Sequence, residues 1–268
     1  MRICMLDSGI GGLPYYKAVR EAFPDADVFY VADNAGFPYG TKTAESIRNI
    51  LFERVRRIRA RLMPDILILS CLTAVEVGIR ELQAIHQSLP IIGVYPPLKQ
   101  AARDSKTRTI AMLTTARAAE DSFLDDLVAK EASDVEVLRI PSQDLVEFVE
   151  QQFLFAGAES AEAAVLPYVS YVTDHSADRI VIASSHIVYL EEAIHAVLAR
   201  ENVSEVRCLD SRKSLVSQLS RMLAHENDSC TISNAQAETG FFLTGEQGPI
   251  ATYRIWASRY GLPEPELF

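Results

Sequence analysis

Short apolar runs that alternate with longer segments of helical periodicity are the feature of this sequence that most constrains its fold. The runs lack the polar alternation of a strand with one face in water, which predicts strands covered on both faces. The first seven residues form one such run, and the others cover residues 28–31, 66–70, 91–95, 109–113, 135–140, 180–183 and 206–209.

The segments between these runs carry apolar residues at the spacing of an amphipathic helix. They cover residues 44–62, 74–88, 144–154, 160–173 and 190–200. Strands that alternate with helices in this way predict an α/β fold with mostly parallel sheets.

Two breaks divide the chain into candidate lobes. Tyr95-Pro96-Pro97 is a rigid extended segment after a predicted strand, and a second break fits near Asp210-Ser211. We therefore expect two pseudo-symmetric α/β lobes, formed by residues 1–96 with 209–268 and by residues 97–208. Because ligands of open α/β sheets bind outside the carboxyl ends of the strands, we expect the active-site cleft between the lobes.

Charge and composition narrow the classes of partner. The 268 residues carry a formal net charge of −10, which opposes binding to the phosphate backbone of nucleic acid. Apolar runs stay well below the roughly 20 residues that span a bilayer, and the charged first strand does not resemble a signal peptide. We expect a cytoplasmic protein with reduced thiols and, because none of its cysteines forms a CxxC pair, without a metal site; the cysteines are Cys4, Cys71, Cys208 and Cys230.

Polar groups follow two predicted strands near the start of the chain. Asp7-Ser8-Gly9 opens a glycine-rich turn, but Pro14 stands where a dinucleotide-binding motif needs its third glycine. An alternative is that Asp7 or Ser8 caps the following helix. Cys71 follows the strand at 66–70 and precedes a predicted helix, whose N-terminus would lower the pKa of the thiol. The alternative is an inert buried cysteine.

Two further strand ends carry hydroxyl groups and an imidazole. Ser184-Ser185-His186 follows the strand at 180–183, so His186 is a candidate for proton transfer, with helix capping by either serine as the alternative. The nucleophile-elbow pattern GxSxG is absent from this segment, which argues against a hydrolase triad. Thr115 follows another strand and could bind a carboxylate or cap a helix.

Several of these segments, in this order, resemble the motifs of one enzyme family. They are DSGIGGL at residues 7–13, PYGTK at 38–42, SCLTA at 70–74, LVEFVE at 145–150, ASSH at 183–186 and FLTG at 242–245. The matching motifs belong to the aspartate/glutamate racemase family, and within it the chain is most similar to glutamate racemase.

The resemblance implies cofactor-independent racemisation of an acidic amino acid, with two cysteines on opposite faces of the substrate carbon. Cys71 matches the first cysteine, and the family's polar groups that tune the thiols fall on Asp7, Glu150 and His186. The resemblance also implies a homodimer in the cytoplasm, without cofactor or metal, that serves peptidoglycan synthesis for the cell wall. The implied substrate contacts are Ser8, Pro38, Tyr39, Gly40, Leu72, Thr73, Thr115 and Ser185.

The sequence departs from the family at two positions of the site. Ser184 stands where the second catalytic cysteine is expected, and a hydroxyl is far less acidic than a thiol. Leu72 stands in place of an asparagine and cannot form a hydrogen bond with a polar substrate. We therefore expect impaired racemisation.

Three functions remain open on the sequence. One is racemase-type chemistry on an acidic amino acid or a related carboxylic acid. Another is a single-cysteine lyase or isomerase that acts on a less polar carboxylic acid. The last is a non-catalytic binding protein that kept the fold.

Overall fold

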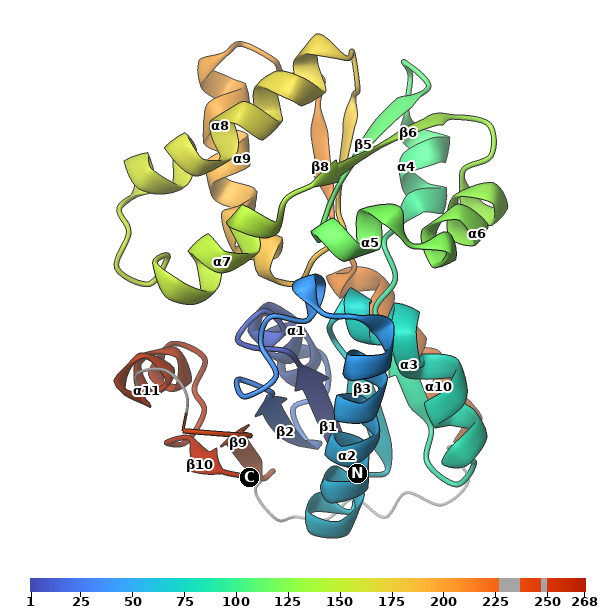
Figure 1. Ribbon diagram of the computed structural model, residues 1–268, viewed down its shortest axis with the longest axis vertical. Helices are drawn as coiled ribbons and strands as arrows, with labels where there is room; N and C mark the ends of the chain where they lie inside the picture. Colours follow the sequence, from blue (N-terminus) through green and yellow to red (C-terminus); the bar gives the residue numbers. More distant parts are fainter. Residues whose placement is uncertain (227–236, 247–249) are drawn as a thin grey trace. The chain divides into compact units, whose positions relative to one another are not determined.

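The computed structural model describes residues 1–226, 237–246 and 250–268, and its chain divides into two compact units (Figure 1). The first unit contains Met1–Phe37, Ala44–Val94 and Arg212–Phe268, and the second contains Pro38–Thr43 and Tyr95–Ser211. The segment Pro38–Thr43 therefore groups with the second unit, although the sequence analysis assigned residues 1–96 to one lobe. The reason is the short 3-10 helix η1 (Tyr39–Thr41), which contacts helix α5 (Ala116–Glu120) of the second unit.

The first unit contains a parallel sheet in which the described strands have the order β10-β9-β2-β1-β3-β4. Its central strands are buried along nearly their whole length, as the unbroken apolar runs predict. The strands are β1 (Arg2–Asp7), β2 (Asp27–Ala32), β3 (Ile66–Leu69), β4 (Ile91–Gly93), β9 (Thr239–Leu243) and β10 (Glu266–Leu267).

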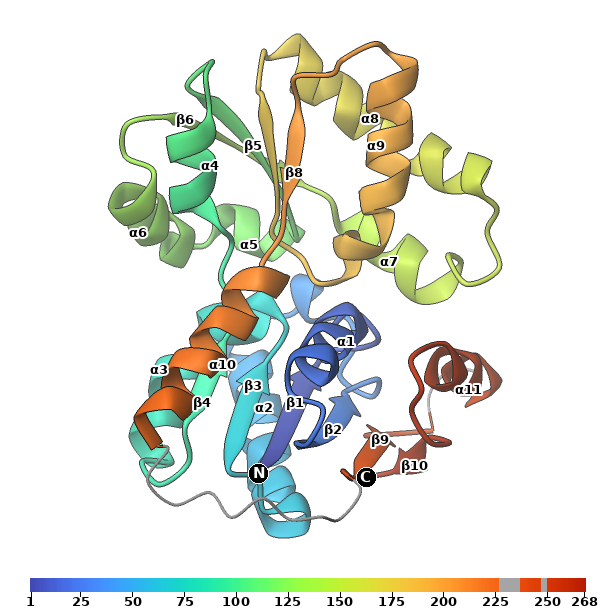
Figure 2. The same ribbon diagram turned by 180° about the vertical axis from the view of Figure 1, so that it is seen from behind.

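Helices cover both faces of this sheet. Helices α1 and α10 contact each other on one face, and α2 and α3 contact each other on the other face (Figures 1 and 2). Residues Ile47, Leu51, Val55 and Ile58 form the buried stripe of α2, which matches the helical spacing in the sequence. The helices are α1 (Leu13–Ala22), α2 (Ala44–Leu62), α3 (Leu72–Ile85), α10 (Arg212–Glu226) and α11 (Ile250–Arg259).

The second unit contains a parallel sheet with the described strand order β6-β5-β7-β8. These strands are β5 (Thr109–Thr114), β6 (Glu136–Pro141), β7 (Arg179–Ile182) and β8 (Arg207–Leu209). Besides η1 and α5, its helical elements are α4 (Leu98–Asp104), α6 (Ser122–Glu131), α7 (Gln143–Gln151), α8 (Ala158–Asp174), η2 (His186–Leu190) and α9 (Glu191–Arg200).

These sheets confirm the α/β class with parallel strands that the sequence predicts. Each expected strand corresponds to an observed one, with ends that differ by up to two residues. Helix α3 starts at Leu72 rather than at the expected residue 74, directly after Cys71. Among the described residues, no helix is long and apolar enough to cross a membrane, and no cluster of His, Cys, Asp and Glu could hold a metal ion. Cys230 lies outside the described residues.

Candidate active site

Adjacent strands β1 and β3 bring Asp7, Ser8 and Cys71 together at the carboxyl end of the first sheet. The sulfur of Cys71 lies 3.9 Å from Ser8 Oγ, and Ser8 Oγ lies 3.5 Å from Asp7 Oδ1. The amide of Gly9 donates a hydrogen bond of 3.2 Å to the same carboxylate oxygen. All three side chains are buried. A thiol, a hydroxyl and a carboxylate thus form a short chain of polar contacts inside the first unit.

The N-terminus of α3 lies beside these three side chains because Cys71 is the N-cap residue of the helix. Its backbone is extended, with φ −98° and ψ 119°, and the helix follows immediately with Leu72 and Thr73, both buried. A helix N-terminus presents backbone N–H groups and a partial positive charge, so it can bind an anion such as a carboxylate. We refer to Asp7, Ser8, Cys71, Leu72 and Thr73 as the Cys71 group.

The pKa of the Cys71 thiol contradicts the sequence-based expectation. Burial, together with the negative charge of Asp7, raises this pKa to about 12, whereas the helix N-terminus led us to expect a lowered value. Hydrogen bonds from the Ala74 amide and the Ser8 hydroxyl act in the opposite direction but are outweighed. Cys71 is therefore a protonated thiol near neutral pH, and it needs a proton acceptor before it can serve as a base.

The hypothesis that Asp7 or Ser8 caps the first helix is wrong, because the N-cap of α1 is Gly12. The turn between Asp7 and Gly12 separates both side chains from the helix start. They contact the Cys71 thiol and the Gly9 amide instead.

In the second unit, His186 and Glu150 form a buried pair. The distance between His186 Nε2 and Glu150 Oε2 is 2.8 Å, and both side chains are almost fully inaccessible to solvent. His186 starts η2 directly after β7, and Glu150 lies on α7, which packs against η2. A buried carboxylate fixes the orientation and tautomer of its imidazole, so this pair is suited to proton transfer.

Ser184 and Ser185 precede His186 and are buried with it. Ser185 occupies the N-cap position of η2 with helical backbone angles, and the carbonyl of Ser184 accepts a hydrogen bond of 3.1 Å from Ile187 N. We refer to Thr115, Glu150, Ser184, Ser185 and His186 as the His186 group, which belongs to the second unit as the Cys71 group belongs to the first.

For Thr115 the capping alternative is confirmed. Its hydroxyl accepts a hydrogen bond of 3.2 Å from the Ala118 amide at the start of α5.

The PYG segment packs tightly against Thr115. A Cβ atom added at Gly40 would lie 2.9 Å from Thr115 Cβ and 2.3 Å from Gln143 Oε1, which explains why position 40 is glycine. The structure therefore brings Pro38, Tyr39 and Gly40 next to Thr115 within the second unit. Sequence reasoning missed Gln143, because the sequence around it offers no motif for this contact.

Comparison with known proteins gives one family. The family model described as Asp/Glu/Hydantoin racemase matches residues 13–219. A glutamate racemase of Glaesserella parasuis is 34% identical over 200 residues, which cover 74% of this chain and 73% of that protein. A glutamate racemase of Pseudomonas aeruginosa is 28% identical over 97% of this chain and 94% of its own length.

The crystal structure of Escherichia coli glutamate racemase with L-glutamate and the activator UDP-MurNAc-ala has the same fold. It superimposes with a TM-score of 0.85 at 24% sequence identity and covers 100% of this chain and 97% of that one.

Proposed function

Because this chain belongs to the Asp/Glu/Hydantoin racemase family, we propose that it catalyses cofactor-independent proton transfer at the α-carbon of an acidic amino acid or a related carboxylic acid. The observation that carries the proposal is the buried chain of Cys71, Ser8 and Asp7 at the N-terminus of α3. Abstraction of an α-proton requires a base, which the thiol becomes when a proton acceptor lies beside it, and a group such as a helix N-terminus that binds the substrate carboxylate.

In the proposed reaction, Asp7 accepts the proton of Cys71 through the Ser8 hydroxyl. The resulting thiolate removes the α-proton of the substrate and becomes a thiol again, while the electron pair stays on the α-carbon and its carboxylate. The amide groups at the start of α3, with Ser8 and Thr73, stabilise the negative charge that grows on this carboxylate. Reversal of the same steps returns a proton to the carbon.

We propose that the His186 group acts on the same substrate. Ser185 and Thr115, with the segment of Pro38, Tyr39 and Gly40, would bind its polar groups. His186, oriented by Glu150, would serve as a second proton-transfer group. In the proposed reaction Ser184 would be the acid that completes inversion, and its hydroxyl is far less acidic than a thiol. Inversion is therefore slow, although removal and return of the proton by Cys71 are not.

The test is deuterium incorporation from D₂O into each enantiomer of glutamate. We expect exchange at the α-carbon with retention, and inversion slower than exchange by about 10²–10⁴-fold because the positioned acid is missing. Inversion that keeps pace with exchange would contradict the proposed role of Ser184. The double variant Ser184→Cys/Leu72→Asn should raise the rate of inversion, with Cys71→Ser as the inactive control.

Leu72 supports a second candidate function. This apolar side chain is buried in the first turn of α3 and cannot form a hydrogen bond with a polar substrate group. A substrate that is less polar than glutamate would not need such a bond. A single-cysteine lyase acting on a less polar carboxylic acid would need only one proton donor, because loss of CO₂ leaves a carbanion that the Cys71 thiol protonates. Release of CO₂ from a malonic acid with an apolar α-substituent, but not from aminomalonate, would favour this function.

The remaining alternative is a non-catalytic binding protein. It predicts that neither deuterium exchange nor CO₂ release occurs with any of these acids, while glutamate still binds in calorimetry.

We further propose that the protein is a cytoplasmic homodimer. Sedimentation velocity tests the assembly, and a monomer over the whole concentration range would contradict it.

A further inference from the structure

The hydroxyl of Tyr30, on β2, is hydrogen-bonded to both ends of the turn that follows Asp7 and Ser8. It donates a hydrogen bond of 2.7 Å to the carbonyl of Gly9 and accepts one of 2.9 Å from the amide of Gly12. Tyr30 is fully buried, so water cannot replace these bonds. One side chain thus fixes the length of the Gly9–Gly12 turn.

The turn is also packed closely against this hydroxyl. A Cβ atom at Gly12 would lie 2.8 Å from Tyr30 Oη and 2.4 Å from Ser70 Oγ, so the backbone fits between two hydroxyl groups. The hydroxyl of Ser70 in turn donates a hydrogen bond of 3.1 Å to the carbonyl of Leu6, at the end of β1. Glycine at position 12 is therefore required by this close approach.

The strand end before the turn is held from both sides. The amide of Ser70 donates to Leu6 O at 2.9 Å, and the amide of Asp33 donates to Asp7 O at 2.8 Å. Ser8 is thus the first residue whose backbone position depends on the turn. Since Ser8 Oγ lies 3.9 Å from the Cys71 sulfur, a small displacement of the turn would break this contact.

We propose that Tyr30 is a positioning residue, whose hydroxyl fixes the Gly9–Gly12 turn so that Asp7 and Ser8 remain in contact with the Cys71 thiol. This inference rests on the proposed function only in treating Cys71 as the proton-transfer group. The ring of Tyr30 has a separate role in packing, because it contacts Tyr16 and Phe241 with centroid distances of 6.3 and 5.6 Å.

The variant Tyr30→Phe separates these two roles, because it keeps the ring contacts and removes only the hydroxyl. The probe is the pH dependence of iodoacetamide alkylation at Cys71, followed on the cysteine-containing peptide by mass spectrometry. Release of the turn should move the Ser8 hydroxyl away from the thiol, and because the hydrogen bond of this hydroxyl lowers the pKa of Cys71, its loss raises that pKa. A rise of about half a unit in the pKa then gives roughly threefold slower alkylation at neutral pH.

Tyr16→Phe is the matched control. Tyr16 is also buried and stacks edge-on against Tyr30, but its hydroxyl interacts with Thr239 and not with the turn. It should leave the alkylation profile of Cys71 at the wild-type position. If Tyr30→Phe matches wild type, or if both variants shift the profile equally, the proposal is overturned.

A second design displaces the Tyr30 hydroxyl without removing it, in case Tyr30→Phe fails to fold. Ser70→Ala frees the side of Gly12 that faces Ser70, and the double variant Gly12→Ala/Ser70→Ala then places the new methyl group against the hydroxyl end of Tyr30, 2.8 Å from Oη and 2.9 Å from Cε2. We expect the double variant to shift the Cys71 profile as Tyr30→Phe does, and Ser70→Ala alone to stay near wild type. Equal profiles for the single and double variants would overturn the proposal.

Deuterium exchange distinguishes this inference from the proposed function. With glutamate in D₂O, Tyr30→Phe should lower the exchange rate at saturating substrate about tenfold and change KM little, because geometry at the thiol matters for proton transfer. Absence of exchange in the wild-type protein would refute the proposed function, whereas the alkylation profiles would still decide the role of Tyr30.

Discussion

Asp7 and Cys71 illustrate how a buried carboxylate affects the ionisation of a neighbouring thiol. Burial opposes the thiolate, and the adjacent carboxylate opposes it further, so the pKa of Cys71 rises to about 12. The same carboxylate is the acceptor that must take the thiol proton in the proposed reaction. The site therefore holds Cys71 as a thiol near neutral pH.

At the scale of this residue pair, we predict that Asp7→Asn speeds alkylation of Cys71 and abolishes deuterium exchange. Loss of the negative charge lowers the pKa of the thiol, so more thiolate is present at a given pH. Exchange nevertheless stops because the proton acceptor is gone. Iodoacetamide alkylation across the alkaline range, with exchange measured in parallel, checks both effects.

Cys208 provides an internal control for this experiment. Its pKa is raised to about 12 by burial and by the charges of Glu191 and Asp210, all in the second unit. Alkylation of Cys208 should be the same in Asp7→Asn and in the wild type. A change at both cysteines would indicate general loosening of the protein rather than an electrostatic effect.

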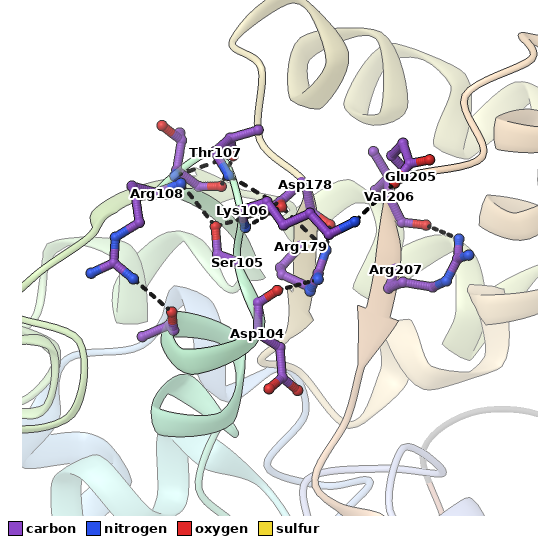
Figure 3. Close-up of polar contacts among 12 residues, drawn as sticks. Asp104, Ser105, Lys106, Thr107, Arg108, Asp178, Arg179, Glu205, Val206 and Arg207 are labelled. Carbon is purple, nitrogen blue, oxygen red and sulfur yellow. Dashed lines mark hydrogen bonds and ion pairs between the residues drawn. The ribbon is translucent and has the colours of Figure 1, made fainter.

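At the scale of elements, Asp178 links two loops at the amino ends of strands β5 and β7 (Figure 3). Its carboxylate accepts hydrogen bonds from Ser105 Oγ at 2.6 Å, Lys106 N at 2.6 Å and Thr107 N at 3.3 Å. Burial alone would raise the pKa of Asp178, but these bonds and the Arg179 guanidinium outweigh it and lower the pKa. The loop that it holds contains Arg108 in the left-handed region, at φ 63°, which is costly for a residue with a side chain.

We predict that Asp178→Asn lowers the free energy of unfolding by roughly 2 to 3 kcal/mol at neutral pH, because the buried Ser105 hydroxyl and two backbone amides lose a charged acceptor. A carboxyl group with a lowered folded pKa stabilises the protein above its unfolded pKa, and this contribution is lost as the pH falls through the folded pKa. The difference between variant and wild type in urea titrations should therefore shrink in acid.

Asp134→Asn is the control for this titration. Asp134 binds Arg108 of the same loop, and its pKa is also lowered, but the carboxylate is exposed to solvent. Exposed ion pairs contribute little, so this variant should unfold almost as wild type does. An equal loss of stability in both variants would contradict the prediction, because the loss could then not be attributed to the buried carboxylate of Asp178.

Another contact between elements joins α2 to the edge strand β10. The guanidinium of Arg61 lies 4.9 Å from the ring centroid of Phe242 and 5.2 Å from that of Phe268, and it donates a hydrogen bond of 2.8 Å to Leu267 O. At least one of the arginines of α2 therefore makes contacts within the protein, so the arginine-rich face of this helix is not reserved for a ligand.

We predict that Arg61→Gln lowers the free energy of unfolding by about 1 kcal/mol, the size of a partly exposed cation–π contact. Amide hydrogen exchange should speed up at Phe268, whose N–H donates to Leu243 O. Arg56→Gln removes an arginine of the same helix that pairs with Glu53 three residues earlier, and it should leave this exchange unchanged. Unaltered protection at Phe268 in Arg61→Gln would contradict the prediction.

At the scale of the whole molecule, the proposed function assigns roles to residues of both units. We predict that glutamate slows the alkylation of Cys71, and that Ser185→Ala or His186→Asn weakens this protection at least about tenfold in glutamate concentration, as expected for loss of a charged or buried hydrogen bond. Both variants lie in the second unit, whereas Cys71 lies in the first.

The control is the same measurement without glutamate. There, both variants should show the wild-type rate of Cys71 alkylation, because neither belongs to the Cys71 group. Protection that survives unchanged in both variants would mean that glutamate binds through the first unit alone.

The sequence by itself determined the parallel α/β class and the elements that carry the site. Unbroken apolar runs become buried strands, and the helical spacing of 44–62 becomes α2, because both patterns depend on neighbours within a few residues. The motifs around Asp7, Cys71 and His186 likewise identify the family, since side-chain identity and order along the chain are sequence properties.

Only the tertiary structure decided the electrostatics and the supports of the site. The pKa of Cys71 was predicted in the wrong direction, because its helix is a local feature while Asp7 and the burial come from packing across β1 and β3. Tyr30 lies within an apolar run and gave no hint of its bonds to Gly9 and Gly12. Parallel crossovers bring together residues far apart in sequence, and the charges and dielectric that fix a pKa depend on those neighbours.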